Sequence, residues 1–445
     1  MSDPFLATGA ASLQRCDQCG ATWPELATST GCPDCGGLLA VVHGAPPVTG
    51  AAVLAEFSEG DNRRAHAGAD SAHAGDGSGA LSGVWRYRTL VMPAATRVVS
   101  WPEGNTPLIQ RDAVSAYAGV TDLALKHEGM NPTGSFKDRG MTVAVTHAVR
   151  AGASAVACAS TGNTSASLAA YAAQAGLPAL VFVPAGKVTT GKLAQAMAYG
   201  AQTLFVDGDF DACLTLAREA SRALGVYLAN SVNPWRLEGQ KTIAWELLAQ
   251  LGWGTPDWIA LPAGALGNTS AFGKALREAK ALGLINRIPR ILAVQAAGAA
   301  PFVRGFENGF ADRMTVHAET IATAIRIGDP ASWDRAVRVI RETNGVVTSV
   351  SDADIMDAKA VIDASGVGCE PASAASVAGV RAMVARGVIK STDRVVCILT
   401  GHLLKDPDTI TAFHMAGGAR ANAPVAIAAT LSEVERVLKT AQVRG

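Results

Sequence analysis

The stretch DLALKHEGMNPTGSFKDRG, residues 122–140, decides how the rest of the chain is interpreted. It opens with an apolar run typical of a buried strand, passes through a glycine-containing turn, and enters a segment with helical periodicity over 136–151. Lys137 therefore falls at the start of a helix, where the helix dipole and burial both disfavour a charged amine. A neutral lysine amine is a Schiff-base nucleophile. On this stretch alone, the more ordinary interpretation is an exposed ion-pair cluster at a helix terminus.

The same alternation of strand and helix continues along the chain. Further strand-like apolar runs lie at 154–160, 178–184, 201–207, 257–264, 289–298 and 393–401. Helical segments are expected between them at 164–175, 190–199, 211–224 and 235–251. Near-continuous apolar strands alternating with helices predict an α/β fold whose parallel sheet is covered on both faces. In such sheets ligands bind at the carboxyl ends of the strands, so the loops that follow strands should carry the chemistry.

The composition is that of a foldable, soluble protein. The 445 residues are 49% hydrophobic and 17% charged, and 38 basic residues balance 38 acidic ones. This balance gives no indication of a nucleic-acid partner or an anionic membrane surface. No basic segment followed by an apolar run opens the chain, and no stretch approaches the roughly 20 uninterrupted apolar residues of a membrane span. We therefore expect a cytoplasmic protein without a membrane partner.

Four cysteines near the N-terminus form two Cys-x-x-Cys pairs, each followed by glycine. These are Cys16, Cys19, Cys32 and Cys35. Two such knuckles at this separation can wrap one tetrahedral Zn²⁺ in a ribbon, and a four-cysteine site leaves no position open for catalysis. The predicted zinc is therefore structural. The alternatives are a ribbon that has lost its ion, reduced cytosolic thiols or, less favoured, disulfides.

A second loop after a strand, residues 159–173, is rich in small polar groups. Ser160, Thr161 and Thr164 offer hydroxyls and Asn163 an amide at the start of an alanine-rich helix. Free backbone N–H groups with small hydroxyls make an anion site. An ordinary helix cap would use the same residue types, so this loop alone does not decide between the two.

A third loop, residues 261–276, places Gly264, Gly267 and Asn268 between a strand and a helix. Backbone amides arranged this way can cradle a phosphate, although a tight strand-to-helix connection would look similar. The spacing matches neither the dinucleotide fingerprint nor the nucleoside-triphosphatase loop. A Schiff-base lysine, a hydroxyl-rich anion loop and a phosphate cradle on one sheet together indicate pyridoxal phosphate. Two anion sites also indicate a substrate with negative groups of its own.

Eight motifs in order along the chain give a family resemblance. They are GNTPL (104–108), NPTGSFKDRG (131–140), STGNTSAS (160–167), NSVNPWRLEGQKT (230–242), PAGALGN (262–268), TAIRIGDPASWDRA (323–336), EPASAASVAG (370–379) and LTGHLLKDP (399–407). The chain resembles the threonine synthases, which are fold type II pyridoxal-phosphate enzymes of the tryptophan synthase β superfamily. That fold implies two doubly wound α/β domains, here with an N-terminal zinc-ribbon-like module. The expected parts are the module at 1–56, a flexible linker or insertion at 57–82, a large domain from 83–138 and 229–420, a smaller subdomain at 139–228, and a helical tail at 421–445.

The resemblance also implies roles for matching residues. Lys137 would hold the cofactor and move protons, with Asp138 and Arg139 supporting its loop. Asn163 would face the cofactor's phenolic oxygen and Thr400 its pyridine nitrogen. Backbone amides would hold the cofactor phosphate along the loop Gly264, Ala265, Leu266, Gly267 and Asn268. The residues implied to bind the phosphorylated amino-acid substrate are Ser160, Thr161, Thr164, Ser231, Asn233 and Arg236. A planar guanidinium suits phosphate, although outside this context Arg236 would be interpreted as a surface arginine.

The implied reaction converts O-phospho-L-homoserine and water to L-threonine and phosphate. Cysteate synthase acting on phosphoserine and serine/threonine dehydratase are alternatives on the same scaffold, and a nucleic-acid-binding scaffold with a dead catalytic domain is a rival of another class. Leu403 stands where the family pattern has glycine, which puts the shape of that loop in question. The S-adenosylmethionine control of plant enzymes is not expected, since no segment before the ribbon resembles their extension. A homodimer is expected from the resemblance.

Overall fold

The computed structural model describes residues 12–44, 50–55, 57, 82–186 and 190–442. Most of the predicted linker, residues 58–81, and the first 11 residues of the predicted N-terminal module lie outside the described residues. The chain divides into two compact units, Met1–Asp406 and Pro407–Gly445. The second unit contains α15 (Pro407–Met415) and α16 (Leu431–Gln442). No helix among the described residues is long and apolar enough to cross a bilayer.

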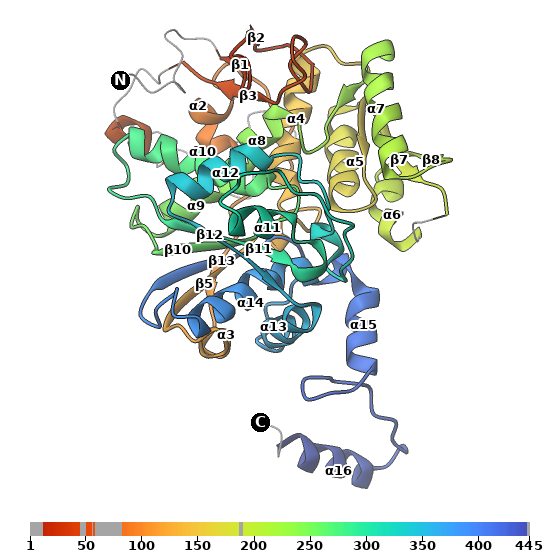
Figure 1. Cartoon of the computed structure of the whole chain (residues 1–445). Helices are drawn as coiled ribbons and strands as arrows, with labels where there is room; N and C mark the ends of the chain where they lie inside the picture. The colour runs from red at the N-terminus through yellow and green to blue at the C-terminus, as the bar shows by residue number, and fades with distance from the viewer. Residues whose placement is uncertain (1–11, 45–49, 56, 58–81, 187–189, 443–445) are drawn as a thin grey trace. The chain divides into compact units, whose positions relative to one another are not determined.

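The larger of the two main sheets is mostly parallel and has six strands in the order β12-β11-β10-β13-β5-β4 (Figure 1). The strands are β4 (Leu108–Gln110), β5 (Asp122–His127), β10 (Trp258–Pro262), β11 (Arg290–Ala296), β12 (Val346–Val350) and β13 (Arg394–Leu399). Only β4 runs antiparallel to its neighbour. Along β10, Trp258 and Ala260 enter one core while Ile259 and Leu261 enter another. Both faces are buried, which explains why these strands appear as unbroken apolar runs in the sequence.

Helices cover both faces of this sheet (Figure 1). One face carries α3 (Asp112–Ala118), α13 (Asp352–Ala364) and α14 (Pro371–Ala385). The other carries α8 (Pro234–Gln240), α9 (Thr242–Gln250), α10 (Gly267–Ala281) and α12 (Trp333–Glu342). The shorter described helices of this unit are η2 (Trp85–Tyr87), α2 (Arg88–Val91), η3 (Glu128–Met130), η4 (Ala297–Ala299), α11 (Pro301–Glu307), η5 (Thr323–Ile325) and η6 (Leu403–Lys405).

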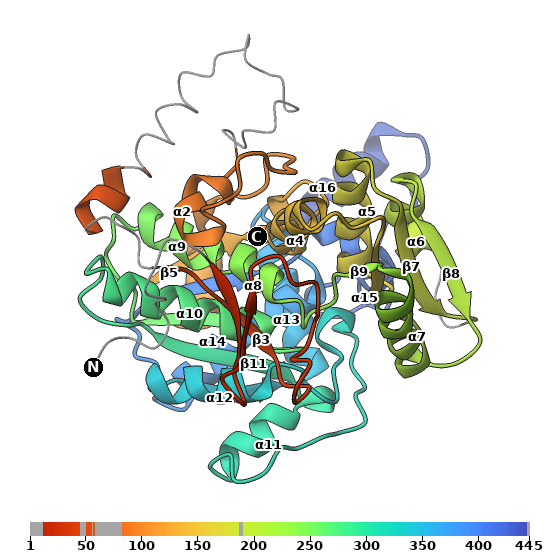
Figure 2. The ribbon, with the colours of Figure 1, turned by 90° about the horizontal axis from the view of Figure 1, so that it is seen from above.

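The smaller sheet is parallel throughout, in the order β8-β7-β6-β9. Its strands are β6 (Val156–Ala159), β7 (Ala179–Pro184), β8 (Gln202–Val206) and β9 (Tyr227–Leu228). The flanking helices are α4 (Lys137–Arg150), α5 (Asn163–Ala175), α6 (Thr190–Ala198) and α7 (Phe210–Leu224), and α4 lies between the two sheets in Figures 1 and 2. Apolar side chains of α4, α5 and α6 pack on one face and those of α7 on the other. The structure is therefore the two-part α/β fold that the sequence predicts.

A three-stranded antiparallel ribbon, β2-β1-β3, precedes both sheets. Its strands are β1 (Leu13–Cys16), β2 (Thr22–Pro24) and β3 (Leu39–Val42). The ribbon contacts three helices. His43 hydrogen bonds to Glu238 of α8 at 2.8 Å, and the Val41 carbonyl accepts from Lys274 of α10 at 2.7 Å. Asp17 forms an ion pair with Arg335 of α12. The ribbon thus packs on the helix that carries Arg236.

The helix predicted over 235–251 is wrong as a single element, because it is divided at Lys241 into α8 and α9. The Lys241 side chain is fully buried and bonds to the Leu90 carbonyl and to Glu238. The Thr242 hydroxyl donates to the Gly239 carbonyl at 2.6 Å, which competes with a continuous helical ladder. The bond to Leu90 is a tertiary contact and the other two are local, and together they end the helix where periodicity would continue it.

Candidate active site

Three loops that follow strands meet at one edge of the large sheet. The strands β5, β13 and β10 are neighbours and parallel, so their carboxyl ends lie together. Ser135 pairs with Gly401 in an isolated bridge, and the Phe136 amide donates to the Thr400 carbonyl at 3.0 Å. The loop that carries Lys137 is therefore bonded directly to the loop that carries Thr400.

Lys137 is the first residue of α4, as the sequence predicts, and its amine lies 4.0 Å from the centre of the Phe136 ring. Within the described residues this amine makes no hydrogen bond. Burial, together with the Arg236 guanidinium, lowers the pKa of Lys137 to about 7, although the Glu370 carboxylate opposes both. At pH 8 roughly nine in ten such amines are neutral, against roughly one in three hundred for a lysine of ordinary pKa. The structure thus holds a nucleophilic amine at the edge of the sheet.

Asp138 fixes the turn before the lysine. Its carboxylate accepts hydrogen bonds from the Thr133 amide at 2.7 Å and the Thr133 hydroxyl at 2.6 Å, and from the Ser167 hydroxyl of α5 at 2.6 Å. Burial raises the pKa of Asp138 to about 6, partly offset by these bonds. Asp138 therefore joins the lysine loop to the smaller sheet.

Arg139 anchors the same helix start from the other side. Its guanidinium bonds to Glu128 at 2.6 and 2.8 Å and to Glu246 at 2.9 and 3.1 Å, and all three side chains are buried. Lys126 adds a second cation on Glu246 at 2.5 Å. The two carboxylates raise the pKa of Arg139 despite its burial. This buried network of ion pairs supports the loop that carries Lys137. Because its charged groups already pair with one another, we assign it a structural role and no reactive one.

The glycine loop after β10 has free backbone donors. Leu266 adopts a left-handed φ of 64° before α10, and a Cβ on Gly264 would lie 3.1 Å from the Ile325 Cα. No backbone N–H of residues 264–269 donates to a protein acceptor within the described chain. The buried side-chain oxygens of Asn268 and Thr269 are also without a partner there. Free amides at a helix start fit a phosphate. The sequence analysis missed Thr269, for which its place in the first helical turn is the one available signal.

A buried glutamate joins two residues that the sequence assigned to the cofactor. The Thr400 hydroxyl donates to Glu370 Oε1 at 3.2 Å, and the Asn163 amide donates to Glu370 Oε2 at 2.9 Å. Asn163 begins α5 beside the smaller sheet, and Thr400 follows β13 in the larger one. The sequence analysis quoted the motif that contains Glu370 without assigning the residue a role, because nothing local distinguishes it from any acidic residue at a helix start.

Arg236 is buried, with 1% of its surface exposed, and is not a surface arginine. Its Nη1 donates to the Ala229 carbonyl at 3.1 Å, but its Nε and Nη2 have no partner among the described residues. Burial lowers its pKa to about 10. A Cβ on Gly140 would lie 2.9 Å from the Arg236 carbonyl oxygen, so α8 lies against α4 one turn beyond Lys137. A buried cation with two free donor positions fits an anion.

The other predicted substrate residues lie at the ends of neighbouring strands of the smaller sheet. Ser160, Thr161 and Thr164 follow β6 and are partly exposed, and Ser231 follows β9. Asn233 caps α8, because its amide oxygen accepts from the Trp235 amide at 3.0 Å and from the Arg236 amide at 3.3 Å. Asn233 therefore fixes the start of the Arg236 helix. Whether these five residues contact substrate stays a prediction.

The four N-terminal cysteines converge. Their sulfur atoms all lie within 4.8 Å of one another, and the Gln18 and Cys19 amides donate to Cys16 Sγ at 3.4 and 3.5 Å. Gly20 and Gly36 complete the two knuckles with left-handed φ angles of 77° and 74°. All four thiols are free. The arrangement fits a tetrahedral thiolate metal site.

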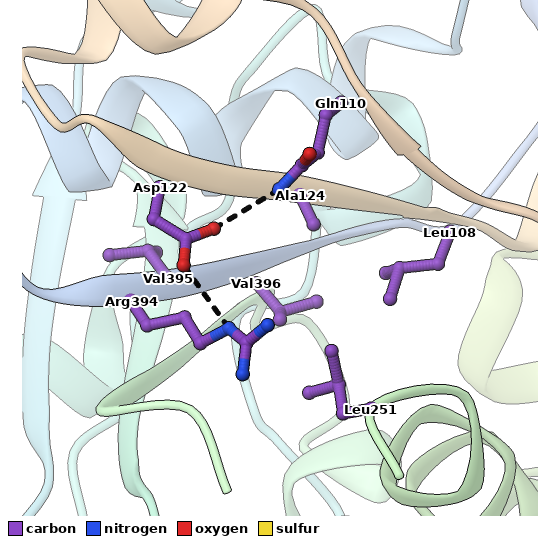
Figure 3. A pocket seen from close by; sticks show the side chains of 8 residues that line it. All are labelled: Leu108, Gln110, Asp122, Ala124, Leu251, Arg394, Val395 and Val396. Atoms are coloured by element: carbon purple, nitrogen blue, oxygen red, sulfur yellow. Dashed lines mark hydrogen bonds and ion pairs between the residues drawn. The ribbon is translucent and has the colours of Figure 1, made fainter. Parts of the chain in front are cut away.

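One further pocket lies at the opposite end of the strands (Figure 3). Its lining includes Asp122 and Arg394, the first residues of β5 and β13. Asp122 accepts from the Gln110 amide at 3.1 Å and pairs with Arg394 at 3.2 Å. This pocket lies at the amino ends of the strands and the Lys137 site lies at their carboxyl ends, so the two are separate. The charged groups of the pocket already bond one another.

Comparisons with known proteins agree with this geometry. Residues 99–401 match the family model described as "Pyridoxal-phosphate dependent enzyme". The chain is 50% identical over 330 residues to a threonine synthase of Methanosarcina acetivorans, covering 74% of this chain and 81% of that protein. It is 41% identical over 430 residues to one from Methanocaldococcus jannaschii, covering 96% and 99%. The solved threonine synthase of Escherichia coli superposes with a TM-score of 0.65 at 18% identity, covering 97% and 100%, which shows a shared fold.

The fold and the family match define a pyridoxal-phosphate-dependent enzyme of fold type II. The free amides of the glycine loop and the unbonded Lys137 amine fit that cofactor. Sequence identity of 41–50% to threonine synthases, over 81–99% of the length of those relatives, identifies the family within this class. The chain belongs to the threonine synthase family.

Proposed function

We propose that this chain converts O-phospho-L-homoserine and water to L-threonine and phosphate. The observation that carries the proposal is the buried Arg236, whose Nε and Nη2 have no partner among the described residues and whose charge acts on the Lys137 amine. One anion site serves the cofactor phosphate, so a second buried cation supports a substrate that carries its own phosphate. A dehydratase has no use for this second site.

Pyridoxal phosphate, when bound, supplies an electron sink that makes protons near the substrate's α-carbon acidic. Lys137 is proposed to hold the cofactor and then, once free and neutral, to take the α-proton from the substrate and, after passing that proton on, a β-proton. Arg236 binds the γ-phosphate and stabilises its charge as the carbon–oxygen bond breaks. Lys137 returns one proton to the γ-carbon, which becomes the methyl group, and a second to the α-carbon. Water gives its hydroxyl to the β-carbon and its remaining proton to the released phosphate.

The remaining proposed contacts position these groups. The backbone amides of Gly264, Ala265, Leu266, Gly267 and Asn268 would hold the cofactor phosphate. Asn163 would face the phenolic oxygen and Thr400 the ring nitrogen. Ser160, Thr161, Thr164 and Ser231 would bind the substrate carboxylate or phosphate, with Asn233 fixing Arg236. The subdomain at 139–228 would close over the substrate to exclude water until hydration.

Phosphate release from phosphohomoserine and phosphoserine, assayed side by side, tests the substrate. The wild type should prefer phosphohomoserine by at least a hundredfold in kcat/KM, and Lys137→Ala should release no phosphate from either. A preference for phosphoserine would instead support the cysteate synthase alternative, because that substrate is one methylene shorter.

We also propose that the four N-terminal thiolates hold a structural zinc ion. Their convergence and the N–H···S bonds to Cys16 support this. Metal analysis of purified protein should give about one zinc per chain. Cys19→Ser should lose it, while the control Cys213→Ser, which alters a buried cysteine of α7, should retain it. If wild-type protein that is expressed and purified in the presence of zinc contains no metal, the proposal is contradicted.

A homodimer and a cytoplasmic location complete the proposal. All eight cysteines are free thiols, which agrees with a reducing compartment. Sedimentation equilibrium on the full chain tests the oligomeric state, and a mass near 45.5 kDa would reject the dimer.

A further inference from the structure

Glu370 occupies an unusual position between the two sheets. It precedes α14, its side chain is 4% exposed, and its amide donates to the Gly401 carbonyl at 3.0 Å. A Cβ on Gly401 would lie 2.3 Å from the Glu370 carboxyl carbon, so the absence of a side chain at 401 provides the space for this carboxyl group. One oxygen faces Thr400 and the other Asn163.

The Thr400 hydroxyl has a second neighbour. The Ser373 hydroxyl lies 3.1 Å from Thr400 Oγ1 and already accepts from the Gly401 amide at 2.9 Å. The Ser373 proton has two acceptors, the Thr400 hydroxyl at 3.1 Å and the more distant Gly401 carbonyl at 3.4 Å, and the shorter contact favours donation to Thr400. A hydroxyl has one proton and two lone pairs, so the protonation state of Glu370 determines where the Thr400 proton points.

The two states differ by one hydrogen bond. If Glu370 is ionised, it can only accept, and the Thr400 proton is directed to it. If Glu370 is protonated, it donates to Thr400, both lone pairs of Thr400 are filled, and the Thr400 proton is free for a third partner. In either state the second Glu370 oxygen can still accept from Asn163.

We propose that Glu370 is a positioning residue that acts through Thr400: the protonated carboxyl directs the Thr400 hydroxyl toward the cofactor's ring nitrogen, and the ionised carboxylate turns it away. The inference rests on the proposed function for the placement of that nitrogen beside Thr400. Donation to the ring nitrogen strengthens the electron sink, so Glu370 adjusts the acidity of the substrate protons that Lys137 removes.

The surroundings favour the protonated form. Burial raises the pKa of Glu370, and the opposing influences are the bond from Asn163, the Lys405 charge, the bond from Thr400 and the Lys137 charge. Its neighbour Cys369 is a buried thiol whose pKa is also raised, so it adds no charge nearby. Lys137 comes from α4 and Lys405 from η6, so the two cations that oppose protonation lie on different elements.

The test measures the hydrogen bond at the ring nitrogen directly. Full-length enzyme is loaded with pyridoxal phosphate that carries the heavy nitrogen isotope in the ring, and its NMR shift is followed against pH without substrate. The wild-type signal should move in one step from a hydrogen-bonded position at low pH to a free position at high pH. Glu370→Gln should keep the low-pH position throughout, because its amide can donate to Thr400 and its carbonyl can accept from Asn163. Thr400→Val should keep the free position throughout.

Glu342→Gln, which removes a carboxylate from a partly exposed ion pair with Arg277, serves as the control and should titrate like the wild type. Glu370→Ala should bind the cofactor at least about tenfold more weakly than Glu370→Gln, because Asn163 and Thr400 both lose their partner. If Glu370→Gln titrates like the wild type, or binds the cofactor as weakly as Glu370→Ala, the inference is overturned. A wild type that titrates as expected but releases no phosphate from phosphohomoserine would refute the proposed function alone.

Discussion

Replacing Arg236 with methionine separates a ligand-binding arginine from a structural one. The side chain is 1% exposed, and two of its donor nitrogens have no protein partner within the described residues. Two charge-assisted hydrogen bonds to phosphate, each worth about 1.5–3 kcal/mol, would be lost. The expected fall in kcat/KM for phosphohomoserine is therefore about 10²- to 10⁴-fold. The apoenzyme should become more stable by about 1–4 kcal/mol, because a buried and incompletely paired charge is removed.

Urea unfolding of the apoenzyme and phosphate release by the holoenzyme measure the two effects. Arg335→Met is the matched control, because Arg335 is also buried but pairs with Asp17 and donates to the Leu39 carbonyl at 2.8 Å. The control should lose stability, since the buried Leu39 residue loses the donor to its carbonyl and Asp17 loses its ion-pair partner. Arg236→Lys should retain stability and still lose much of the activity, because an ammonium lacks the planar fork. If Arg236→Met loses stability as the control does and keeps kcat/KM within about threefold, Arg236 is structural and the reasoning fails.

Three other outcomes depend on Lys137 and its supports. The deprotonated Lys137 amine captures the cofactor, and the pKa of this amine is lowered to about 7. The rate at which apoenzyme captures pyridoxal phosphate, followed by stopped-flow absorbance, should therefore rise with pH and be half-maximal near pH 7. A rate that rises only above about pH 9 would contradict this. Glu246→Gln should lower the free energy of unfolding by about 3–5 kcal/mol, since Lys126 and Arg139 lose a buried carboxylate, and a loss below about 1 kcal/mol would reject that role. Gly239→Ala places a Cβ 1.8 Å from the Arg139 carbonyl oxygen. The substitution should therefore lower the free energy of unfolding in urea by about 1–3 kcal/mol and weaken cofactor binding. Unchanged stability would mean that α4 and α8 adjust freely.

Local sequence signals were sufficient for much of the fold. The strands around Lys137 and the glycine loop are buried on both faces, so each stands out as an apolar run next to a turn. The start of α4 at Lys137 followed from the same pattern. Strands such as β9, which has only two residues, and β12, which reads VVTSV, carry too weak a local pattern to be predicted.

What the sequence could not supply are contacts between distant residues. Glu370 bonds to Asn163 across 207 positions and to Thr400 across 30, so nothing local marks it as part of the site. His43 of the ribbon bonds to Glu238 across 195 positions, which places the ribbon on α8. The division of the 235–251 segment likewise comes from the buried Lys241, whose partners lie outside the helix pattern. In each case a tertiary contact outweighs the local signal.

The path of oxygen tests the proposed reaction most directly. Holoenzyme is supplied with phosphohomoserine in water that carries the heavy oxygen isotope, and the label is located by mass spectrometry in both products. Elimination breaks the bond between the γ-carbon and oxygen, so phosphate leaves with all of its original oxygens and water supplies the β-hydroxyl. We therefore predict one labelled oxygen in each threonine and none in the released phosphate. Label in the phosphate, with homoserine as the product, would mean simple ester hydrolysis and would contradict the function proposed for Lys137 and Arg236.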